Sequence, residues 1–146
     1  MRKYRSSLPA KMLAARQKEP GGPLSLEEVD LPRPKKGEVL VKMDSSPINP
    51  SDLALLSGGY LARSYPFTPG LEGSGRVVRS GGGILAQLRM GKRVACSPTS
   101  GADGCWAEYM VTSATHCAPL PRNISLEQGS MMLVNPMTAM AFILLA

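Results

Sequence analysis

Residues 37–60 read GEVLVKMDSSPINPSDLALLSGGY, a stretch that contains the clearest strand of the chain and a short helix. The run 38–44 is rich in apolar residues and follows a Pro- and Gly-containing turn, which predicts a strand. Pro50 suits the first position of a helix, because its missing N–H has no partner there, and Gly58 suits the end. The sequence therefore predicts a helix at 50–56.

Outward from this stretch, turns rich in Gly and Pro separate further short segments of strand-like composition. Strands are predicted at 11–17, 24–29, 73–79, 92–96 and 105–111. The 146 residues include 15 Gly and 13 Pro, a composition that favours many turns over a helical bundle. The expected fold class is therefore mainly β with short helices, arranged as a barrel or a sandwich.

The character of the chain changes at Ser125. Ser125 and Gln128 have the spacing of a capping box, and no charged residue follows Glu127. Pro136 predicts a break or a new helix start within this apolar segment. A helix that is apolar all round needs partners on each face, so the chain is expected to be cut within a larger fold. The expected parts are a basic, flexible head at 1–10, a main domain at 11–124 and a helical connection at 125–146.

The net charge of +6 comes from the start of the chain. Residues 1–18 hold six of the 17 basic residues and no acid, and the remaining 11 basic residues balance the 11 acids. No folded basic face is therefore predicted, and no nucleic-acid partner. The apolar run 137–146 is too short for a membrane span. Three cysteines without a close pair favour a reduced, cytoplasmic setting, with organelle targeting by the basic head as the alternative.

Read without reference to any protein family, the sequence contains no nucleotide-binding motif and no metal-binding motif. Two glycines open the predicted strand at 73–79, and 81–83 are expected to form a loop with no helix after it, so neither makes a dinucleotide fingerprint. The single histidine, His116, falls in a strand-like segment, 115–119. Cys96 and Cys105 are too far apart for a zinc knuckle, so no metal site is predicted.

Several short motifs follow one another in a specific order: PGGP (20–23), LEEV (26–29), PKKGEVLV (34–41), INPSD (48–52), PGLEGSG (69–75), GKRVA (91–95), WAEY (106–109) and VNPMTA (134–139). This series resembles the N-terminal catalytic domain of the medium-chain dehydrogenase/reductase superfamily, from about Lys11 onward. The resemblance implies a GroES-like, partly open β-barrel. In the superfamily a Rossmann domain that carries the coenzyme follows, and this chain is expected to lack it.

Two positions resemble the zinc-independent branch of that superfamily. Asn49 stands where the zinc-dependent alcohol dehydrogenases have a ligand Cys, and Leu71 stands where they have a ligand His. Neither side chain supplies a thiolate or an imidazole. The run 48–60 looks most like the branch of quinone oxidoreductases and 2-enoyl thioester reductases. The resemblance implies a small-molecule substrate, an α,β-unsaturated carbonyl or a quinone, and NADPH as the coenzyme of the complete enzyme.

The resemblance also assigns roles to individual residues. Tyr60 is expected to donate a hydrogen bond to the enolate oxygen or a proton to the α-carbon. Asn49 is expected at the substrate and nicotinamide contact, with a helix N-cap as its alternative. Thr138 is expected near the nicotinamide, with a bond back to a helix carbonyl as its alternative. Asp52 and Glu72 are expected to be structural, capping turns or pairing with basic neighbours such as Arg76, and Trp106 is expected in the core.

Two functions of different classes follow. The first is the substrate-domain portion of an NADPH-dependent oxidoreductase that works without zinc and is inactive as this chain alone. The second is a non-enzymatic GroES-like module that self-associates or docks through its apolar tail. The tail supports the second because its surface is too apolar to remain solvated.

Overall fold

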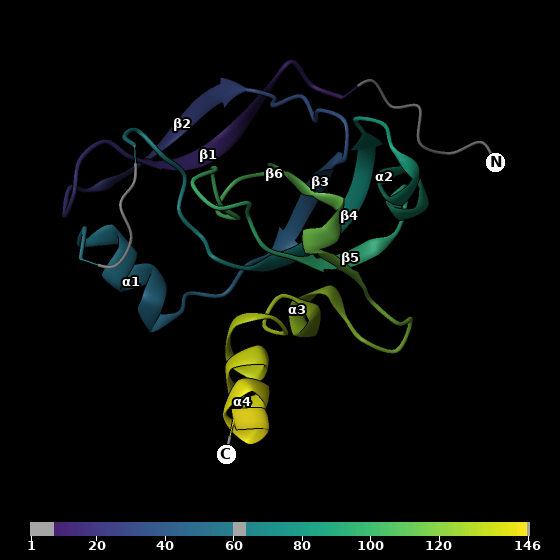
Figure 1. The fold of residues 1–146 in the computed structure, drawn as a ribbon. Helices are drawn as coiled ribbons and strands as arrows, with labels where there is room; N and C mark the ends of the chain where they lie inside the picture. Colours follow the sequence, from purple (N-terminus) through teal and green to yellow (C-terminus); the bar gives the residue numbers. More distant parts are fainter. Residues whose placement is uncertain (1–7, 60–63, 146) are drawn as a thin grey trace.

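Two antiparallel sheets form the body of the protein in the computed structural model, which describes residues 8–59 and 64–145 (Figure 1). The strands of these residues are β1 (Lys11–Gln17), β2 (Leu24–Asp30), β3 (Glu38–Ser45), β4 (Gly73–Ser80), β5 (Arg93–Cys96), β6 (Tyr109–Ser113) and β7 (Cys117–Pro119). The helices are α1 (Pro50–Leu56), α2 (Ile84–Arg89), the 3-10 turn η1 (Ala114–His116), α3 (Leu126–Gly129) and α4 (Val134–Leu145).

The larger sheet has the strand order β6-β3-β4-β5-β7, with every neighbouring pair antiparallel. Strand β3 is buried because it lies between β6 and β4, and Val39, Leu40 and Val41 have no exposed surface. The edge strands β6 and β7 do not pair with each other within the described residues. The body is therefore a partly open barrel, and the mainly β fold with short helices expected from the sequence is confirmed.

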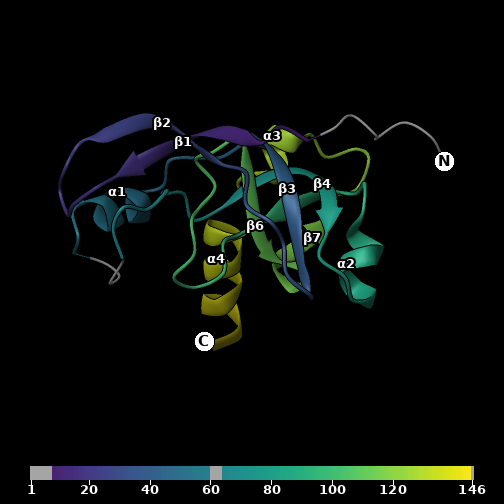
Figure 2. The same cartoon turned by 90° about the horizontal axis from the view of Figure 1, so that it is seen from above.

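The β1–β2 hairpin covers one face of this sheet, as seen from above in Figure 2. Met12 and Ala14 of β1 form a buried cluster with Leu40 and Tyr109. A second cluster on the other face includes Val39, Val41, Val77 and Val94. Alternate residues of β3 thus contribute to different cores, as the two-residue period of a strand requires.

Most predicted strands are confirmed within one residue, but the strand expected at 105–111 is wrong in its first half. Strand β6 begins only at Tyr109. Trp106 instead bonds across the chain, because its N–H donates to Pro69 O and its carbonyl accepts from Ala15 N–H. Trp106 is also half-buried rather than part of either core cluster, and its Nε1 donates to Pro47 O at 3.3 Å. The expected core position of Trp106 is therefore wrong.

The loop expected at 81–83 without a following helix is also wrong, because α2 starts directly after Gly83. Gly83 has a φ of +95°, a conformation that glycine adopts readily, and it turns the chain into the helix. Burial of Ala86 against the larger core stabilises this six-residue helix, which local propensity alone does not favour. His116 likewise lies in η1, and β7 begins one residue later.

The C-terminal segment contains two helices, as the capping box and Pro136 predict. Ser125 Oγ accepts from Gln128 N–H, and Gln128 Oε1 accepts from Ser125 N–H, both at 3.0 Å. Pro136 lies in the first turn of α4, where a missing N–H costs little. Helix α4 projects from the body and buries none of its described residues (Figure 1).

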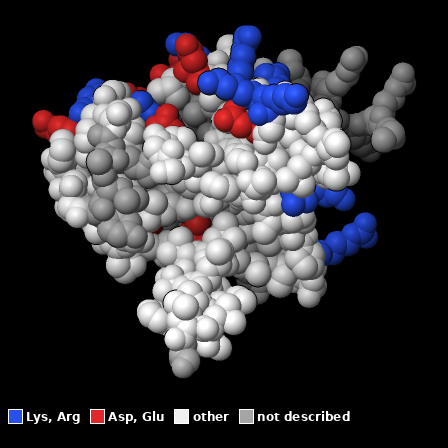
Figure 3. Space-filling view, in the orientation of Figure 1, with Lys and Arg blue, Asp and Glu red and all other residues white. Residues whose placement is uncertain are grey.

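The surface of α4 seen in Figure 3 shows only uncharged atoms. Most Lys, Arg, Asp and Glu side chains in this view gather at the end of the body away from α4, while some basic side chains extend from the right side and an acidic side chain is visible just above α4. Among the described residues, no helix combines the length and the apolar character that crossing a bilayer requires.

All three cysteines are free and buried, which predicts unreactive thiols. A hydrogen bond with Cys105, followed by burial, raises the pKa of Cys96, and burial raises the pKa of Cys117 to about 12. At pH 8 roughly one Cys117 thiol in ten thousand is then ionised. We expect no reaction with Ellman's reagent in the native protein and three equivalents in urea. Rapid reaction of any thiol in the native state would contradict this burial.

Candidate functional site

Asn49 lies at the N-terminus of α1, where local sequence and long-range contacts both hold it. Its backbone is extended, with φ −91° and ψ 155°, and Pro50 follows as the first helical residue. Asp52 Oδ2 accepts a hydrogen bond from Asn49 N–H at 2.8 Å, which is one half of a capping box. The other oxygen, Asp52 Oδ1, accepts from Leu71 N–H at 2.9 Å. Asp52 therefore ties the start of α1 to the segment that leads into β4.

Glu72 connects the start of α1 to α4. Its side chain is 1% exposed, and its Oε1 accepts a hydrogen bond from Asn49 Nδ2 at 3.0 Å. Its Oε2 accepts from the backbone N–H groups of Leu133 at 2.9 Å and Val134 at 3.0 Å. A carboxylate in this position satisfies donors that the first turn of a helix leaves free and interacts favourably with the helix dipole.

The Asn49 side chain is oriented at both of its polar atoms. Asn49 Nδ2 donates to Glu72, and Asn49 Oδ1 accepts from Asn135 Nδ2 at 3.3 Å. Asn49, Asp52, Glu72 and Asn135 form what we call the amide–carboxylate cluster. It joins α1, β4 and α4, three elements that are far apart in the sequence.

Asn49, Asp52 and Glu72 of the cluster are buried, and Asn135 is exposed at the start of α4. Burial raises the pKa of Asp52, while hydrogen bonds from the backbone N–H groups of Asn49 and Leu71 oppose that rise. Glu72 receives its three hydrogen bonds from one amide and two backbone groups. The capping role expected of Asp52 and Glu72 is thus observed. Among the described residues, no group of three or more His, Cys, Asp or Glu side chains is placed to hold a metal ion.

The other predicted site residues differ in how the structure places them. Thr138 is exposed on α4, and its Oγ1 donates to Val134 O at 2.7 Å, which is the alternative weighed for it. It lies three residues after Asn135, a spacing that puts both side chains on one face of the helix. The structure therefore places Thr138 one turn from the amide–carboxylate cluster. Tyr60 lies outside the described residues.

Asn135 was not predicted from the sequence as a site residue. Its position in the VNPMTA run, next to Pro136 at a helix start, was the available signal. That run carried the family resemblance as a motif, but nothing in it indicated a contact with Asn49. Only the fold brings these two amides together across 86 positions of the chain.

The cluster presents hydrogen-bond donors of the kind that a carbonyl or a carboxamide accepts. Asn49 Nδ2 carries two N–H groups, and Glu72 accepts from this atom along one direction. The Thr138 hydroxyl adds both a donor and an acceptor one turn away. These groups fit the carboxamide end of a nicotinamide coenzyme. The Gly-rich turn 81–83 joins β4 to α2, but both sheet neighbours of β4 are antiparallel, whereas the turn that holds a pyrophosphate belongs to a parallel βαβ unit.

Comparison with known proteins agrees with this architecture. The alcohol dehydrogenase GroES-like domain family matches residues 35–122. A mitochondrial enoyl-[acyl-carrier-protein] reductase of Caenorhabditis elegans is 36% identical over 118 residues, covering 80% of this chain and 33% of its own length. A quinone oxidoreductase of Rattus norvegicus is 32% identical over 123 residues, covering 82% of this chain and 36% of its own length.

A solved structure resembles the chain still more completely. A Mesorhizobium loti protein assigned as an NADPH:quinone reductase superposes with a TM-score of 0.86 and 32% identity, covering 95% of this chain and 45% of that protein. The chain spans about a third of the length of the two curated relatives. Because the GroES-like family matches more than half of its residues, the chain belongs to the alcohol dehydrogenase GroES-like domain family, within the medium-chain dehydrogenase/reductase superfamily.

Proposed function

We propose that the chain is the substrate-domain portion of an NADPH-dependent oxidoreductase that reduces α,β-unsaturated carbonyls or quinones without zinc. The observation that carries the proposal is the Asn49 carboxamide, held between Glu72 and Asn135 at the start of α4. The names of the relatives, quinone oxidoreductase and enoyl reductase, support the reaction class.

In this proposal the chain's own residues bind and polarise the oxygen of the substrate. NADPH supplies the hydride when it is bound. Asn49 Nδ2 donates to the carbonyl or carboxamide oxygen, and Glu72 and Asn135 hold that amide in one orientation. Thr138 orients the nicotinamide from the next turn of α4. Tyr60 donates to the enolate oxygen or delivers a proton to the α-carbon. Hydrogen-bond donors that are fixed in advance supply the stabilisation that zinc would otherwise provide.

A domain replacement tests this function directly. The chain would replace the equivalent part of the Mesorhizobium loti protein. The match between the two proteins covers 95% of the residues of this chain. We expect the chimera to oxidise NADPH when a quinone or an enone is added. In the same chimera, Asn49→Ala is expected to lower kcat by roughly tenfold to a hundredfold, because one oriented donor is lost. A folded chimera that binds NADPH but shows no turnover with either substrate class would contradict the proposal.

The isolated chain is expected to bind NADPH only weakly. Its described residues supply groups for the nicotinamide end, and the chain spans about a third of the curated relatives. Calorimetric titration of the 146-residue chain with NADPH should therefore give no binding in the micromolar range. The Rattus norvegicus relative serves as the comparison under the same conditions. Micromolar affinity of the chain alone would contradict the expectation that its coenzyme site is incomplete.

The exposed surface of α4 favours a second candidate, a module that self-associates through this helix. Phe142, Ile143, Leu144 and Leu145 are each more than 70% exposed. Apolar residues clustered in this way on a projecting helix are typical of an interaction surface. Light scattering should then show a dimer that Ile143→Asp dissociates and Leu26→Asp, at an exposed apolar position of β2, leaves intact. A monomer at high protein concentration would contradict this candidate.

We propose a cytoplasmic location, with organelle import directed by the basic head at 1–10 as the alternative. The relative from Caenorhabditis elegans is named as mitochondrial, which supports keeping the alternative. A fluorescent fusion of the whole chain, compared with one that starts at residue 11 and keeps β1, distinguishes them.

A further inference from the structure

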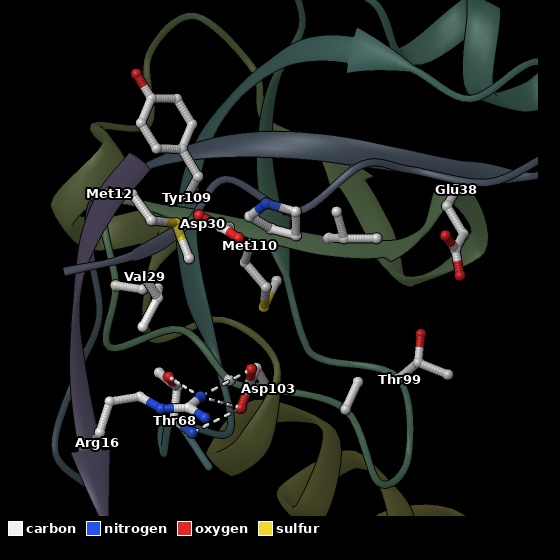
Figure 4. Close-up of a pocket in the computed structure, with 15 residues that line it drawn as sticks. Met12, Arg16, Val29, Asp30, Glu38, Thr68, Thr99, Asp103, Tyr109 and Met110 are labelled. Carbon is white, nitrogen blue, oxygen red and sulfur yellow. Dashed lines mark hydrogen bonds and ion pairs between the residues drawn. The ribbon is translucent and has the colours of Figure 1, made fainter. Parts of the chain in front are cut away.

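A cavity of about 380 Å³ lies beside the edge strand β6, under the β1–β2 hairpin and the loop 99–104 (Figure 4). In Figure 4, Met12, Val29 and Met110 point toward the space in its middle. None of the four residues of the amide–carboxylate cluster lines this cavity. The cavity is therefore separate from that cluster.

One end of the cavity carries two charges that neutralise each other. Arg16 Nη1 donates to both carboxylate oxygens of Asp103 at 2.9 Å, and Arg16 Nη2 donates to Pro66 O at 2.8 Å. These contacts fix the guanidinium in the wall, so this ion pair offers a ligand no net charge. Asp30 also lines the cavity, but Lys11 lies opposite it in the hairpin register and offsets its charge.

The other end carries a carboxylate that a ligand can reach. Glu38 is half-buried at the start of β3, and in Figure 4 its side chain points toward the space from one side while Thr99 points toward it from the other. Glu38 Oε2 accepts a hydrogen bond from Lys35 N–H at 2.8 Å. Glu38 Oε1 has no hydrogen-bond partner, and no Lys or Arg side chain of the described residues forms an ion pair with Glu38. This oxygen can therefore accept a hydrogen bond from a ligand, and its charge favours a cation over an anion.

The walls between these two ends are mainly apolar. Met12, Val29 and Met110 are joined there by Ala107 and Val111. Methionine side chains pack well against aromatic rings, because their sulfur is polarisable. An apolar cavity of about 150 Å³ holds one benzene ring, so about 380 Å³ leaves room for two fused rings with a short arm.

We propose that this cavity is a second small-molecule site, which binds a bicyclic aromatic amine in its protonated form. The ammonium group donates to Glu38 Oε1, and the rings pack between the methionine and valine side chains. An uncharged compound of the same shape gains only the apolar contacts, and an aromatic carboxylate is repelled by Glu38. The site rests on the lining residues alone and does not depend on the proposed reductase function.

Three probes with one indole ring system test the site on the 146-residue chain by NMR titration. Tryptamine carries an ammonium group at neutral pH, as lysine does, tryptophol carries a hydroxyl in its place, and indole-3-acetate is an anion. We expect tryptamine to shift the amide signals of Met12, Val29, Glu38 and Met110. Tryptophol is expected to bind roughly fivefold more weakly, since an ion pair with a half-buried carboxylate contributes only modestly. No shift of these signals is expected with indole-3-acetate.

Two variants and one control identify the position of the ligand. Glu38→Gln keeps an oxygen for Lys35 N–H but removes the charge, so tryptamine should bind only as tightly as tryptophol. Val111→Phe fills the cavity from β6 and should abolish the shifts with both compounds. Asp44→Asn removes a charge from an exposed position of β3 that does not line the cavity, and it should change neither affinity.

The proposal is overturned if the parent chain binds tryptamine and tryptophol equally, or if a folded Glu38→Gln variant keeps the preference for tryptamine. It is also overturned if none of the probes binds, or if the shifts map to Asn49 and α4 instead of the cavity.

Discussion

Glu72→Ala is expected to lower the free energy of unfolding by about 3–5 kcal/mol, since it leaves one buried and two partly buried donors without an acceptor. Those donors are Asn49 Nδ2 and the N–H groups of Leu133 and Val134, at 2.9–3.0 Å from the carboxylate. The side chain is 1% exposed, so water does not replace it without rearrangement. Urea denaturation of the variant and the parent measures the loss.

Glu72→Gln separates the effect of losing the hydrogen bonds from the effect of losing the side-chain volume. Glutamine keeps one oxygen for the start of α4 and turns an N–H₂ group toward Asn49, whose amide then has to flip. We expect most of the stability to return, with a residual loss of about 1 kcal/mol. Glu127→Ala, on the exposed side of α3, is the matched control and should change stability by less than about 0.5 kcal/mol.

Hydrogen exchange locates the effect within the molecule. In Glu72→Ala the amides of Leu133 and Val134 should lose protection, while those of the central strand β3 should keep it. A variant that unfolds at the urea concentration of the parent would contradict the role of Glu72 as the link between β4 and α4.

The strands and caps were predictable because their causes lie within a few residues. Apolar runs between Gly and Pro residues predicted β3 and β4, and two short patterns predicted the starts of α1 and α3. Helix α2 was missed because burial of Ala86 stabilises it, not its own sequence. The start of β6 was misplaced because residues 105 and 106 bond to the segment 69–70, which a local pattern does not reveal.

The candidate site was predictable only in part for the same reason. The resemblance to a known family selected Asn49, and the preference of Asn for helix starts gave the same position a structural role. The partners of its side chain come from Glu72, 23 residues away, and Asn135, 86 residues away. Such contacts follow from the order of strands in the sheet and from the path of the chain into α4, so no local pattern indicates them.

Asn49→Asp is expected to destabilise the protein by about 3 kcal/mol at pH 7, although aspartate is as good an N-cap as asparagine. The new carboxylate would lie about 3 Å from Glu72 Oε1, where the amide now donates at 3.0 Å. It would also add a charge to a cluster that already holds buried Asp52. Two carboxylates this close share one proton, and the apparent pKa of the pair is raised.

The sign of the pH dependence distinguishes this repulsion from a packing defect. A raised pKa in the folded state means that the folded protein binds more protons than the unfolded chain does. The stability of Asn49→Asp should therefore be recovered at low pH and lost as the pH rises through the pKa of the pair.

Asn49→Ser keeps a cap but adds no charge, and Asn123→Asp adds the charge on the surface. Both should follow the parent's pH profile in urea denaturation at pH 5 and pH 8. If Asn49→Asp also follows it, Glu72 does not share a buried hydrogen bond with residue 49, and the amide–carboxylate cluster cannot orient the substrate donor.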